Sequence, residues 1–339
     1  MIQVLVIGAG PIGLETTAAL QGGGLDVTCV DAGPVGGTIF SLFPPNTRFF
    51  SSPERLAIAG IGLQVPAQEK ATREEYLAYL RSVVTTLDLP VHTYETVTAA
   101  GHDDQGWTVT TRDRGGQERR RTATHVVLAI GGTHRVRRLG VPGEDLPHVD
   151  HDLGDPHRFF RRRVVIIGGK NSAAEAALRC WRAGAEVSIV HRGDALHERV
   201  KYWILPELES LIEEGRVTAH FNSQVSRIEP HAVHVDGPGG PAEIPCQDVL
   251  MMIGYEQDPA LFELFGVTRE GPQDAPQHDV TTMQTTVPGV FVAGTAVAGT
   301  QQRFRTYIEN AHVHAGRITA AILGHPPPPE VPARILPEA

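Results

Sequence analysis

Apolar runs alternate with glycine-rich turns along the chain, and two long stretches repeat the same order of elements. Residues 4–33 and 164–193 each contain an apolar run, a glycine-rich turn, a helix of small residues, a glycine break and a second apolar run. Two short apolar runs joined by a helical pattern are typical of a β-α-β unit, whose right-handed crossover makes its two strands parallel. The pattern therefore predicts two parallel β-α-β units in one chain.

Each predicted unit is followed by a stretch of alternating residues and then by one more strand. Alternating residues with a glycine-rich turn occupy 107–122 and 232–245, and apolar runs that end in glycine follow at 124–133 and 247–255. Alternation of this kind predicts an antiparallel meander, and the apolar runs predict strands that close the parallel sheets. We therefore expect an α/β fold with two Rossmann-like, doubly wound dinucleotide-binding domains, each carrying a small antiparallel β-meander.

The order of the remaining segments predicts that one domain is inserted into the other. Segments 134–162 and 255–280 have no clean period and read as connections; a strand, a turn and a helix over 303–323 follow the second connection. This last part has no β-α-β unit of its own, so we expect it to complete the first domain. The predicted boundaries are 1–140 with 260–325 for the first domain, 141–259 for the inserted domain and 326–339 for a Pro-rich extended tail.

The composition narrows the partners of the protein. Its 339 residues carry a formal net charge of −9, which disfavours a nucleic acid or an anionic membrane, since either attracts a basic face. The basic run at 117–121 lies beside a Gly-Gly turn and reads as a solvated hairpin edge. A strand pattern begins almost at the first residue without a signal-peptide pattern, and no apolar run has the length of a membrane span. Three widely spaced cysteines form no CxxC pair, so we expect a reducing cytoplasm. His312 and His314 stand two residues apart, on different sides of a predicted helix, so we expect no metal site there.

The first turn, residues 8–13 (GAGPIG), is a complete G-x-G-x-x-G between a strand and a helix. In this pattern the first glycine makes the tight turn, the second lets the backbone approach a pyrophosphate and the third packs the helix on the strand. The helix N-terminus then receives the phosphate charge. Asp31 stands at the end of the second strand, where a carboxylate accepts the hydroxyls of a free ribose and repels a 2′-phosphate. The first domain is therefore predicted to bind a dinucleotide with an unphosphorylated ribose.

We assign a flavin to this first domain. Two dinucleotide domains suggest two dinucleotides, one relaying electrons for the other, and the returning segment 287–294 (VPGVFVAG) offers a large flavin contacts from the far end of the chain. We expect the N-terminal end of the 303–323 helix to face the flavin pyrimidine. Phe50 and Ser51 are candidates for a wall of the ring, with core packing for Phe50 and a helix cap at Ser51 or Ser52 before Pro53 as the alternatives. The predicted FAD-binding residues are Gly8, Gly10, Pro11, Ile12, Gly13, Asp31, Ala32, Gly37, Thr38, Phe50, Ser51, Val97, Gly131, Gly294 and Thr295.

The second turn, residues 168–173 (GGKNSA), departs from the first at two positions. Lys170 replaces the second glycine, where its ammonium is able to pair with a phosphate, and Ala173 replaces the third, where a small side chain still packs closely. His191 and Arg192 stand where the first unit has its acid, and a basic pair there favours the 2′-phosphate of NADP over NAD. The predicted NADPH-binding residues, with surface charge as the alternative for Arg199 and Lys201, are Gly168, Gly169, Lys170, Asn171, Ser172, Ala173, His191, Arg192, Arg199, Lys201 and Gly254.

With these residues the chain resembles the thioredoxin-reductase-like FAD/NADPH flavoproteins, and within them the bacillithiol disulfide reductase (YpdA-type) family. The resemblance rests on segments that span nearly the whole chain, chiefly "FFSSPERLAIAG", "GGKNSAAEAALRC", "HRGD", "KYWILPEL", "TTVPGVFVAG" and "YIENAHVHAGRI". It implies an NADPH domain inserted into an FAD domain. It also implies NADPH-dependent reduction of a small-molecule thiol disulfide, bacillithiol disulfide, through FAD. We further expect a homo-oligomer.

This chain departs from the patterns of thioredoxin reductases and YpdA-type proteins at positions that bear on the mechanism. Thioredoxin reductases carry a CxxC in the NADPH domain, which is absent here, and many YpdA-type proteins carry a cysteine where this chain has Ile12. Thr295 stands where thioredoxin reductases have an aspartate, which fits the YpdA-type pattern. Cys29, Cys180 and Cys246 read as structural, because buried free cysteine behaves as a small hydrophobe. No catalytic side chain is assigned: either the reduced flavin attacks the disulfide directly, or the substrate is not a disulfide.

Two other functions agree with the same residues. A ferredoxin- or flavodoxin-NADP reductase of this architecture also lacks a CxxC, although acidic partners prefer a basic docking face and this chain has a net charge of −9. An NADPH-sensing regulatory flavoprotein that binds a partner protein is the third alternative. A flavin monooxygenase is disfavoured because the sequence shows no matching second fingerprint.

Overall fold

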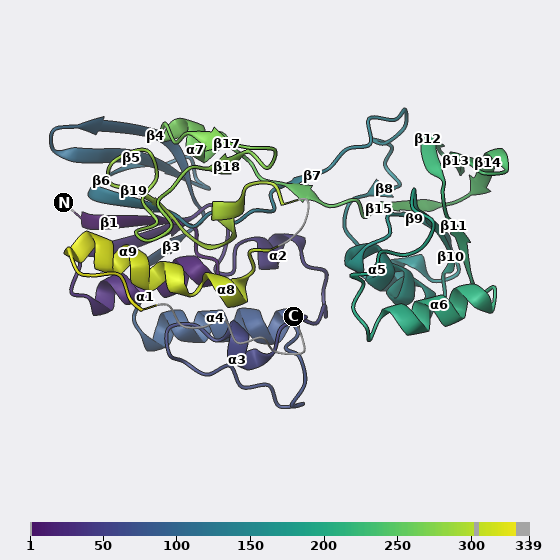
Figure 1. The fold of residues 1–339 in the computed structure, drawn as a ribbon, viewed down its shortest axis with the longest axis horizontal. Coiled ribbons are helices and arrows are strands. Elements are labelled where there is room, and N and C mark those ends of the chain that lie inside the picture. Colours follow the sequence, from purple (N-terminus) through teal and green to yellow (C-terminus); the bar gives the residue numbers. More distant parts are fainter. Residues whose placement is uncertain (1, 302–304, 330–339) are drawn as a thin grey trace. The chain divides into compact units, whose positions relative to one another are not determined.

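The computed structural model describes residues 2–301 and 305–329, and the chain divides into two compact units. Unit 1 comprises the residues up to Arg135 together with those from Glu256 onward, and unit 2 comprises Val136–Tyr255 (Figure 1). Two short paired strands, β7 (Arg135–Val136) and β16 (Tyr255–Glu256), carry the chain from one unit to the other and back. The junctions lie a few residues from the expected boundaries at 140/141 and 259/260.

A parallel sheet forms the centre of unit 1. Its strands run in the order β3 (Val91–Thr93), β2 (Val27–Asp31), β1 (Ile2–Ile7) and β6 (Glu118–Leu128), and β19 (Val290–Val292) pairs with β6. Val4, Leu5 and Val6 of β1 have no exposed surface, as expected for a central strand covered on both faces. Because β19 joins this sheet from the far end of the chain, the returning segment completes unit 1.

The antiparallel meander of unit 1 grows out of the same sheet. Strand β4 (Glu95–Asp103) pairs with β5 (Gly106–Asp113), which pairs with the first half of β6, while the second half of β6 pairs with β1. Unit 1 also contains the paired short strands β17 (Arg269–Glu270) and β18 (Ala275–Pro276) and the short helix η2 (Gly294–Ala298), whereas the short helix η1 (Pro156–Phe159) belongs to unit 2.

Helices α1 (Pro11–Gly22) and α9 (Val313–Leu323) pack against each other in unit 1, and α4 (Arg73–Thr86) begins at a capping box of Thr72 and Glu75. The unit also contains α2 (Thr38–Leu42), α3 (Pro53–Leu56), α7 (Ala260–Leu264) and α8 (Ile308–Ala311).

The helix predicted over 303–323 is wrong at its start. Arg303 itself lies outside the described residues, and helix α8 begins only at Ile308. The side chain of Asn310 accepts a hydrogen bond from the backbone N–H of Tyr307 (2.8 Å) and donates to the carbonyl of Arg305 (2.6 Å). These bonds hold Tyr307 in an extended conformation (φ −129°, ψ 176°), which prevents an earlier start.

Unit 2 repeats the architecture on a smaller scale. Its parallel sheet has the order β11 (Val217–His220), β10 (Glu186–Val190), β9 (Arg163–Ile167), β15 (Asp248–Met251) and β8 (Val149–Asp150). Helices α5 (Asn171–Arg182) and α6 (Leu205–Glu213) follow β9 and β10, and the meander consists of β12 (Gln224–Glu229), β13 (Ala232–Gly237) and β14 (Gly240–Pro245). The predicted fold class is confirmed: two Rossmann-like units, each with a meander, one inserted into the other.

The end of the described chain lies against α9. A Cβ placed on Gly316 would stand 3.3 Å from Cγ of Pro328. The rest of the predicted Pro-rich tail, 330–339, lies outside the described residues. Among the residues that the structure covers, no helix has both the length and the apolar character to cross a membrane.

Candidate functional site

Two glycines of the first turn are required by the packing of the turn itself. Gly8 follows β1 with φ +112°, and a Cβ there would stand 2.4 Å from the carbonyl oxygen of Ala129. A Cβ on Gly13 would stand 1.9 Å from the carbonyl oxygen of Gly8. Atoms at such distances overlap, so the turn, α1 and the end of β6 approach this closely only because both positions are glycine.

Gly10 differs from these two glycines because the protein itself leaves room for a side chain there. It is the N-cap of α1 with φ −73° and ψ 177°, and a Cβ would meet nothing within 4 Å. The open space lies where the first N–H groups of α1 point, which is the place that receives a pyrophosphate in this type of turn. The turn therefore fits a dinucleotide, and no contact within the protein requires glycine at position 10.

Asp31 is the last residue of β2, and its carboxylate accepts hydrogen bonds from the backbone on either side. Its Oδ2 accepts a hydrogen bond from the backbone N–H of Ala9 (2.6 Å), and its Oδ1 accepts one from Gly33 (2.7 Å). Burial raises the pKa of this carboxyl, and the two backbone donors act in the opposite direction. Each carboxylate oxygen has more than one lone pair, so both remain able to accept a ribose hydroxyl.

The returning segment places η2 beside the first turn. Gly294 has φ +70°, and a Cβ there would stand 3.2 Å from Cβ of Ile12. A Cβ on Gly131 would lie 3.9 Å from both the Thr295 hydroxyl and Cγ2 of Thr38. A Cβ on a further candidate, Gly37, would be 3.7 Å from Gly10. The structure thus brings candidates from four separate segments of the sequence to one place.

The remaining candidates of unit 1 lie around this centre. Ala32 is exposed just beyond Asp31, and Val97 is half-buried on β4, where it packs against apolar core residues. Phe50 is half-buried beside Ser51, whose hydroxyl donates to the Glu309 carboxylate on α8. Ser51 is therefore bonded to α8. The N-cap of α3 is Ser52, and its side chain makes no capping hydrogen bond.

Two polar residues that the sequence did not indicate hold the turn at Gly294. His314 of α9 is buried, and its Nδ1 accepts a hydrogen bond from the Gly294 backbone N–H (3.1 Å). The amide of Gln257, also buried, donates to the carbonyls of Gly131 (2.8 Å) and Ala296 (3.1 Å). The available sequence signal for His314 was a histidine within a helix of small apolar residues. Gln257 lies in a connection, where no periodic pattern indicates it.

The pKa of His314 shows which form of the ring makes this contact. Burial, followed by the charge of Arg317, lowers the pKa to about 4, so the imidazole is neutral at physiological pH. A neutral ring has one acceptor nitrogen, and here it is Nδ1. Within 2–301 and 305–329, no three His, Cys, Asp or Glu side chains are grouped so that they would hold a metal ion.

The second turn, in unit 2, accommodates Lys170 because the backbone dihedral angles at position 170 are ones that any residue adopts. Gly168 is the strained position: it has φ +145°, and a Cβ would stand 2.6 Å from the carbonyl oxygen of Met252. Lys170, in contrast, is the N-cap of α5 with φ −109° and ψ −173°, an extended conformation like that of Gly10. Ala173 is fully buried against the turn.

His191 packs into this turn rather than projecting from it. A Cβ on Gly169 would stand 2.4 Å from its Nδ1, and a Cβ on Gly193 would stand 2.7 Å from its Nε2. Burial, followed by the positive charge of Arg192, lowers the pKa of His191. Its neutral form is therefore favoured, and the exposed Arg192 supplies the positive charge at the end of β10.

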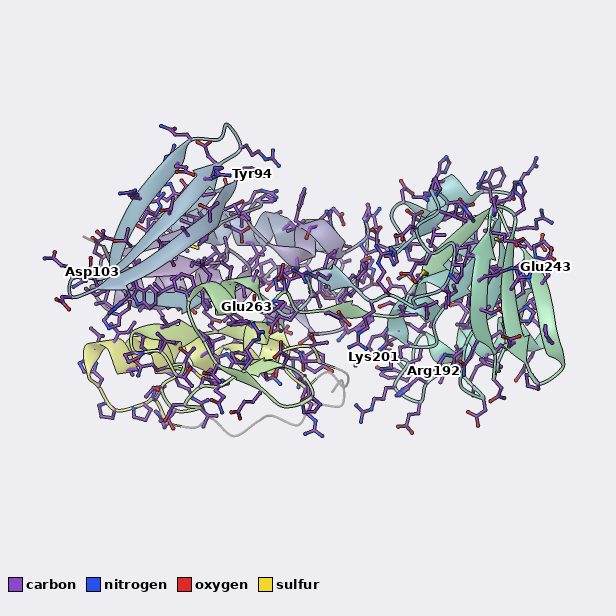
Figure 2. All side chains as sticks on the ribbon, turned by 90° about the horizontal axis from the view of Figure 1, so that it is seen from above. Tyr94, Asp103, Arg192, Lys201, Glu243 and Glu263 are labelled. Carbon is purple, nitrogen blue, oxygen red and sulfur yellow. The ribbon has the colours of Figure 1, made fainter. Side chains whose placement is uncertain are left out.

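Hydrogen bonds hold the loop after β10 against the second turn. The backbone N–H of His197 donates to the carbonyl of Gly169 (2.9 Å). The Asn171 side chain donates to the carbonyl of Arg199 (3.2 Å) and accepts from the N–H of Lys201 (2.9 Å). These bonds place two cationic residues beside the turn, and Figure 2 shows Arg192 and Lys201 on the same edge of unit 2.

Two candidates lie at the margins of this second site. Ser172 is exposed in the first turn of α5. Gly254 follows β15 with φ +100°, and its carbonyl accepts a hydrogen bond from the backbone N–H of Arg137 (3.0 Å). This glycine therefore shapes the chain where it leaves unit 2.

The three cysteines are buried and unsuited to nucleophilic attack. Cys29, Cys180 and Cys246 are free and have no exposed surface. Burial raises their pKa values to about 12, about 12 and about 11, respectively. Because the thiolate is the reactive form, these thiols are chemically inert near neutral pH.

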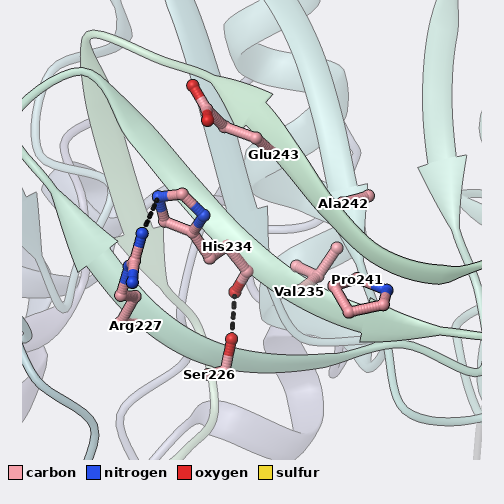
Figure 3. Close-up of a pocket in the computed structure, with 7 residues that line it drawn as sticks. All are labelled: Ser226, Arg227, His234, Val235, Pro241, Ala242 and Glu243. Carbon is pink, nitrogen blue, oxygen red and sulfur yellow. Dashed lines mark hydrogen bonds between the residues drawn. The ribbon is translucent and has the colours of Figure 1, made fainter.

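A separate depression lies on the meander of unit 2. It has a volume of about 350 Å³, and its lining includes Arg227 and His234, whose side chains are 3.3 Å apart (Figure 3). The other lining residues are Ser226, Val235, Pro241, Ala242 and Glu243. They include none of the predicted cofactor residues, so the depression is distinct from the nucleotide turn.

Comparisons with known proteins identify the family of the chain. Residues 5–294 match the family described as "Pyridine nucleotide-disulphide oxidoreductase". Bacilliredoxin reductase Bdr of Bacillus subtilis (strain 168) is 34% identical over 325 residues, covering 95% of this chain and 98% of that protein. A ferredoxin–NADP reductase of Ignicoccus hospitalis is 26% identical over 313 residues, covering 87% and 90%.

A solved structure is similar in fold over nearly the whole chain. Bacillithiol disulfide reductase Bdr (YpdA) from Bacillus cereus matches with a TM-score of 0.90 and 32% identity, covering 95% of this chain and 99% of that one. The fold, the paired turns and these likenesses lead to one conclusion. The chain belongs to the pyridine nucleotide-disulphide oxidoreductases, a family of flavin enzymes that use a pyridine nucleotide, and within it to the YpdA-type bacillithiol disulfide reductases, as the sequence resemblance predicted.

Proposed function

We propose that this chain reduces bacillithiol disulfide with electrons from NADPH, with FAD held by unit 1 and NADPH by unit 2. The net reaction is NADPH + H⁺ + RSSR → NADP⁺ + 2 RSH, where RSSR is bacillithiol disulfide. Two electrons pass from the nicotinamide to the disulfide, whose S–S bond breaks. FAD supplies the electron carrier for this transfer.

One contrast carries the assignment of the two nucleotides. The strand after the first turn ends in Asp31, whose carboxylate suits the free ribose hydroxyls of FAD. The strand after the second turn ends beside the exposed guanidinium of Arg192, and Arg199 and Lys201 are fastened nearby. Such a group of cations suits a 2′-phosphate, which distinguishes NADPH from NADH.

The chain's own residues then bind and orient the two dinucleotides. In unit 1 the open N-terminus of α1 at Gly10 receives the pyrophosphate, and Asp31 orients the adenosine ribose. His314 and Gln257 hold the turn of Gly294 and Gly131 in the shape that borders this space. In unit 2 the lysine at position 170 offers an ammonium to the second pyrophosphate.

We further propose that the disulfide is reduced without a thiol from this protein. Thiol–disulfide exchange needs a thiolate, and burial keeps the pKa values of Cys29, Cys180 and Cys246 at about 11 to 12. Ile12, beside Gly294, offers no sulfur where many relatives carry one. The substrate disulfide would therefore take its electrons from the flavin directly.

The acceptor is the part of this proposal that an assay tests. Purified, flavin-loaded protein is mixed with NADPH and given bacillithiol disulfide, ferredoxin or oxygen alone, while absorbance follows NADPH. We expect sustained oxidation of NADPH only with the disulfide. Sustained turnover only with ferredoxin would replace the proposed acceptor, as the Ignicoccus relative's name suggests. Flavin reduction without turnover by any acceptor would support an NADPH sensor instead.

Two accompanying expectations belong to the same proposal. Three free, buried cysteines suit a reducing compartment, and we place the reaction in the cytoplasm. A homo-oligomer stays a prediction, which sedimentation of the flavin-loaded protein tests: a single species at the mass of one chain, 36.6 kDa, would contradict it.

A further inference from the structure

An exposed pair of aromatic side chains lies in the loop between β10 and α6. Tyr202 has 70% of its surface exposed and Trp203 has 37%. Their rings meet nearly at right angles (87°) with centroids 4.8 Å apart. Two large aromatic rings side by side on a surface are unusual for a monomeric protein face, because their burial would release ordered water.

The backbone that carries this pair is fixed rather than loose. Lys201, the residue before Tyr202, donates its N–H to the side chain of Asn171 at the start of α5 (2.9 Å), and the same side chain donates to Arg199 (3.2 Å). The N–H of Ile204 donates to the carbonyl of Lys201 (2.8 Å). The aromatic pair is therefore held directly beside the second nucleotide turn.

The two rings do not offer equal faces. The ammonium of Lys201 lies 5.8 Å from the centre of the Trp203 ring, over one of its faces. The two rings meet edge to face, and Tyr202 keeps about twice the exposed fraction of Trp203, 70% against 37%. Tyr202 therefore presents the more accessible face for a flat partner.

We propose that the Tyr202 ring stacks on the adenine of the bound nicotinamide dinucleotide, with Trp203 as its support; this rests on the proposed function. The loop follows β10, the second strand of the β9-α5-β10 unit, and that side of such a unit carries the adenosine half of the nucleotide. Arg192 and Lys201 belong to the same loop and suit the phosphate of the same half. An aromatic ring and cations in one loop match an aromatic base that carries phosphate groups.

The test uses 2′,5′-ADP, which contains the adenosine half without the nicotinamide. Binding to the flavin-loaded full chain is measured by calorimetry, in parallel with NADP⁺. Tyr202→Ala is expected to weaken the binding of both ligands by roughly tenfold, the scale of one base–aromatic stack. Tyr202→Phe keeps the ring and is expected to bind both within about twofold of the wild type. Because Tyr202 is largely exposed, both variants should fold, which circular dichroism checks.

The outcomes separate this inference from the function on which it rests. Wild-type protein that binds neither ligand would overturn both the NADPH assignment and the stacking. Tight binding by the wild type with unchanged affinity in Tyr202→Ala would overturn the stacking alone. A loss for NADP⁺ without a loss for 2′,5′-ADP would also overturn it, since the ring would then contact the nicotinamide half. Equal losses for both ligands, restored by Tyr202→Phe, support it.

Discussion

The backbone N–H of Gly294 donates to Nδ1 of His314 over 3.1 Å, across the contact between η2 and α9. Gly294 also adjoins Ile12 of the first turn. One buried imidazole therefore fixes the returning segment against the turn that we assign to FAD. This contact depends on a neutral ring, and the pKa of about 4 keeps the ring neutral.

Replacement of His314 tests whether this contact supports flavin binding. His314→Leu leaves a buried N–H without an acceptor, which should lower the unfolding free energy by about 1–3 kcal/mol. It should also reduce the flavin content of the purified protein. His314→Asn places an oxygen near the position of Nδ1 and should restore much of both. Denaturant titration and flavin absorbance give the two readouts, and a leucine variant equal to the wild type in both would contradict this role.

The same residue predicts a pH dependence of stability. The pKa of His314 is lowered from 6.5 to about 4 on folding. Its stabilising contribution is fully present above pH 6.5 and is lost as the pH falls toward 4, because the unfolded chain then binds a proton that the folded chain excludes. The full effect is about 3 kcal/mol.

The measurement compares denaturant titrations of the wild type and His314→Asn between about pH 7 and about pH 5. The wild type should lose more unfolding free energy over this range than the variant, since the other titrating groups are common to both. Parallel losses in the two proteins would show that His314 does not carry the dependence.

The two kinds of glycine in the first turn predict opposite phenotypes. A Cβ on Gly10 meets nothing within 4 Å, so Gly10→Ala should lower the unfolding free energy of flavin-free protein by only about 1 kcal/mol or less, the cost of a poorer N-cap, and weaken flavin binding by at least about tenfold. A Cβ on Gly13 would stand 1.9 Å from a carbonyl oxygen, so Gly13→Ala should destabilise the flavin-free protein by about 2 kcal/mol or more. Flavin titration and denaturation distinguish them. If Gly10→Ala bound flavin normally, the pyrophosphate would not lie at this turn.

Removal of the cation at the end of β10 should change the choice of nucleotide. Arg192→Ala loses a guanidinium that we place on the 2′-phosphate, so NADPH should bind about tenfold more weakly while NADH binds as before. Arg227→Ala is the matched control, because Arg227 also belongs to unit 2 but lies on the meander, 3.1 Å from Glu229. Rapid reduction of the flavin at varied nucleotide concentration gives both affinities. An equal effect of the two variants would indicate general electrostatics rather than a phosphate site.

The order of elements was predictable because local patterns determine it. The two β-α-β units follow from apolar runs and glycine turns, and Gly8 and Gly13 are required by contacts within their own turn. Asp31 was found from its place at a strand end, and its two backbone bonds agree with that position. The late start of α8 was missed because it depends on the side chain of Asn310.

Roles that depend on distant neighbours were not predictable in the same way. Histidine 191 was expected to supply charge, but its ring packs between Gly169 and Gly193, and burial favours its neutral form. Gln257 lies far from Gly131 in the sequence and meets it only in the folded unit. Nothing in the periodicity around such residues indicates a partner, so only the structure reveals these contacts.

The central claim is that NADPH reduces the disulfide without a protein thiol, and a cysteine-free chain tests it most directly. The variant Cys29→Ala/Cys180→Ala/Cys246→Ala removes all three thiols. Its flavin content and flavin reduction by NADPH serve as controls for folding, with the three single variants as a second set. The account predicts that NADPH-dependent reduction of bacillithiol disulfide continues at a rate close to that of the wild type. Loss of disulfide reduction in a variant that keeps its flavin and still reduces it with NADPH would contradict the account.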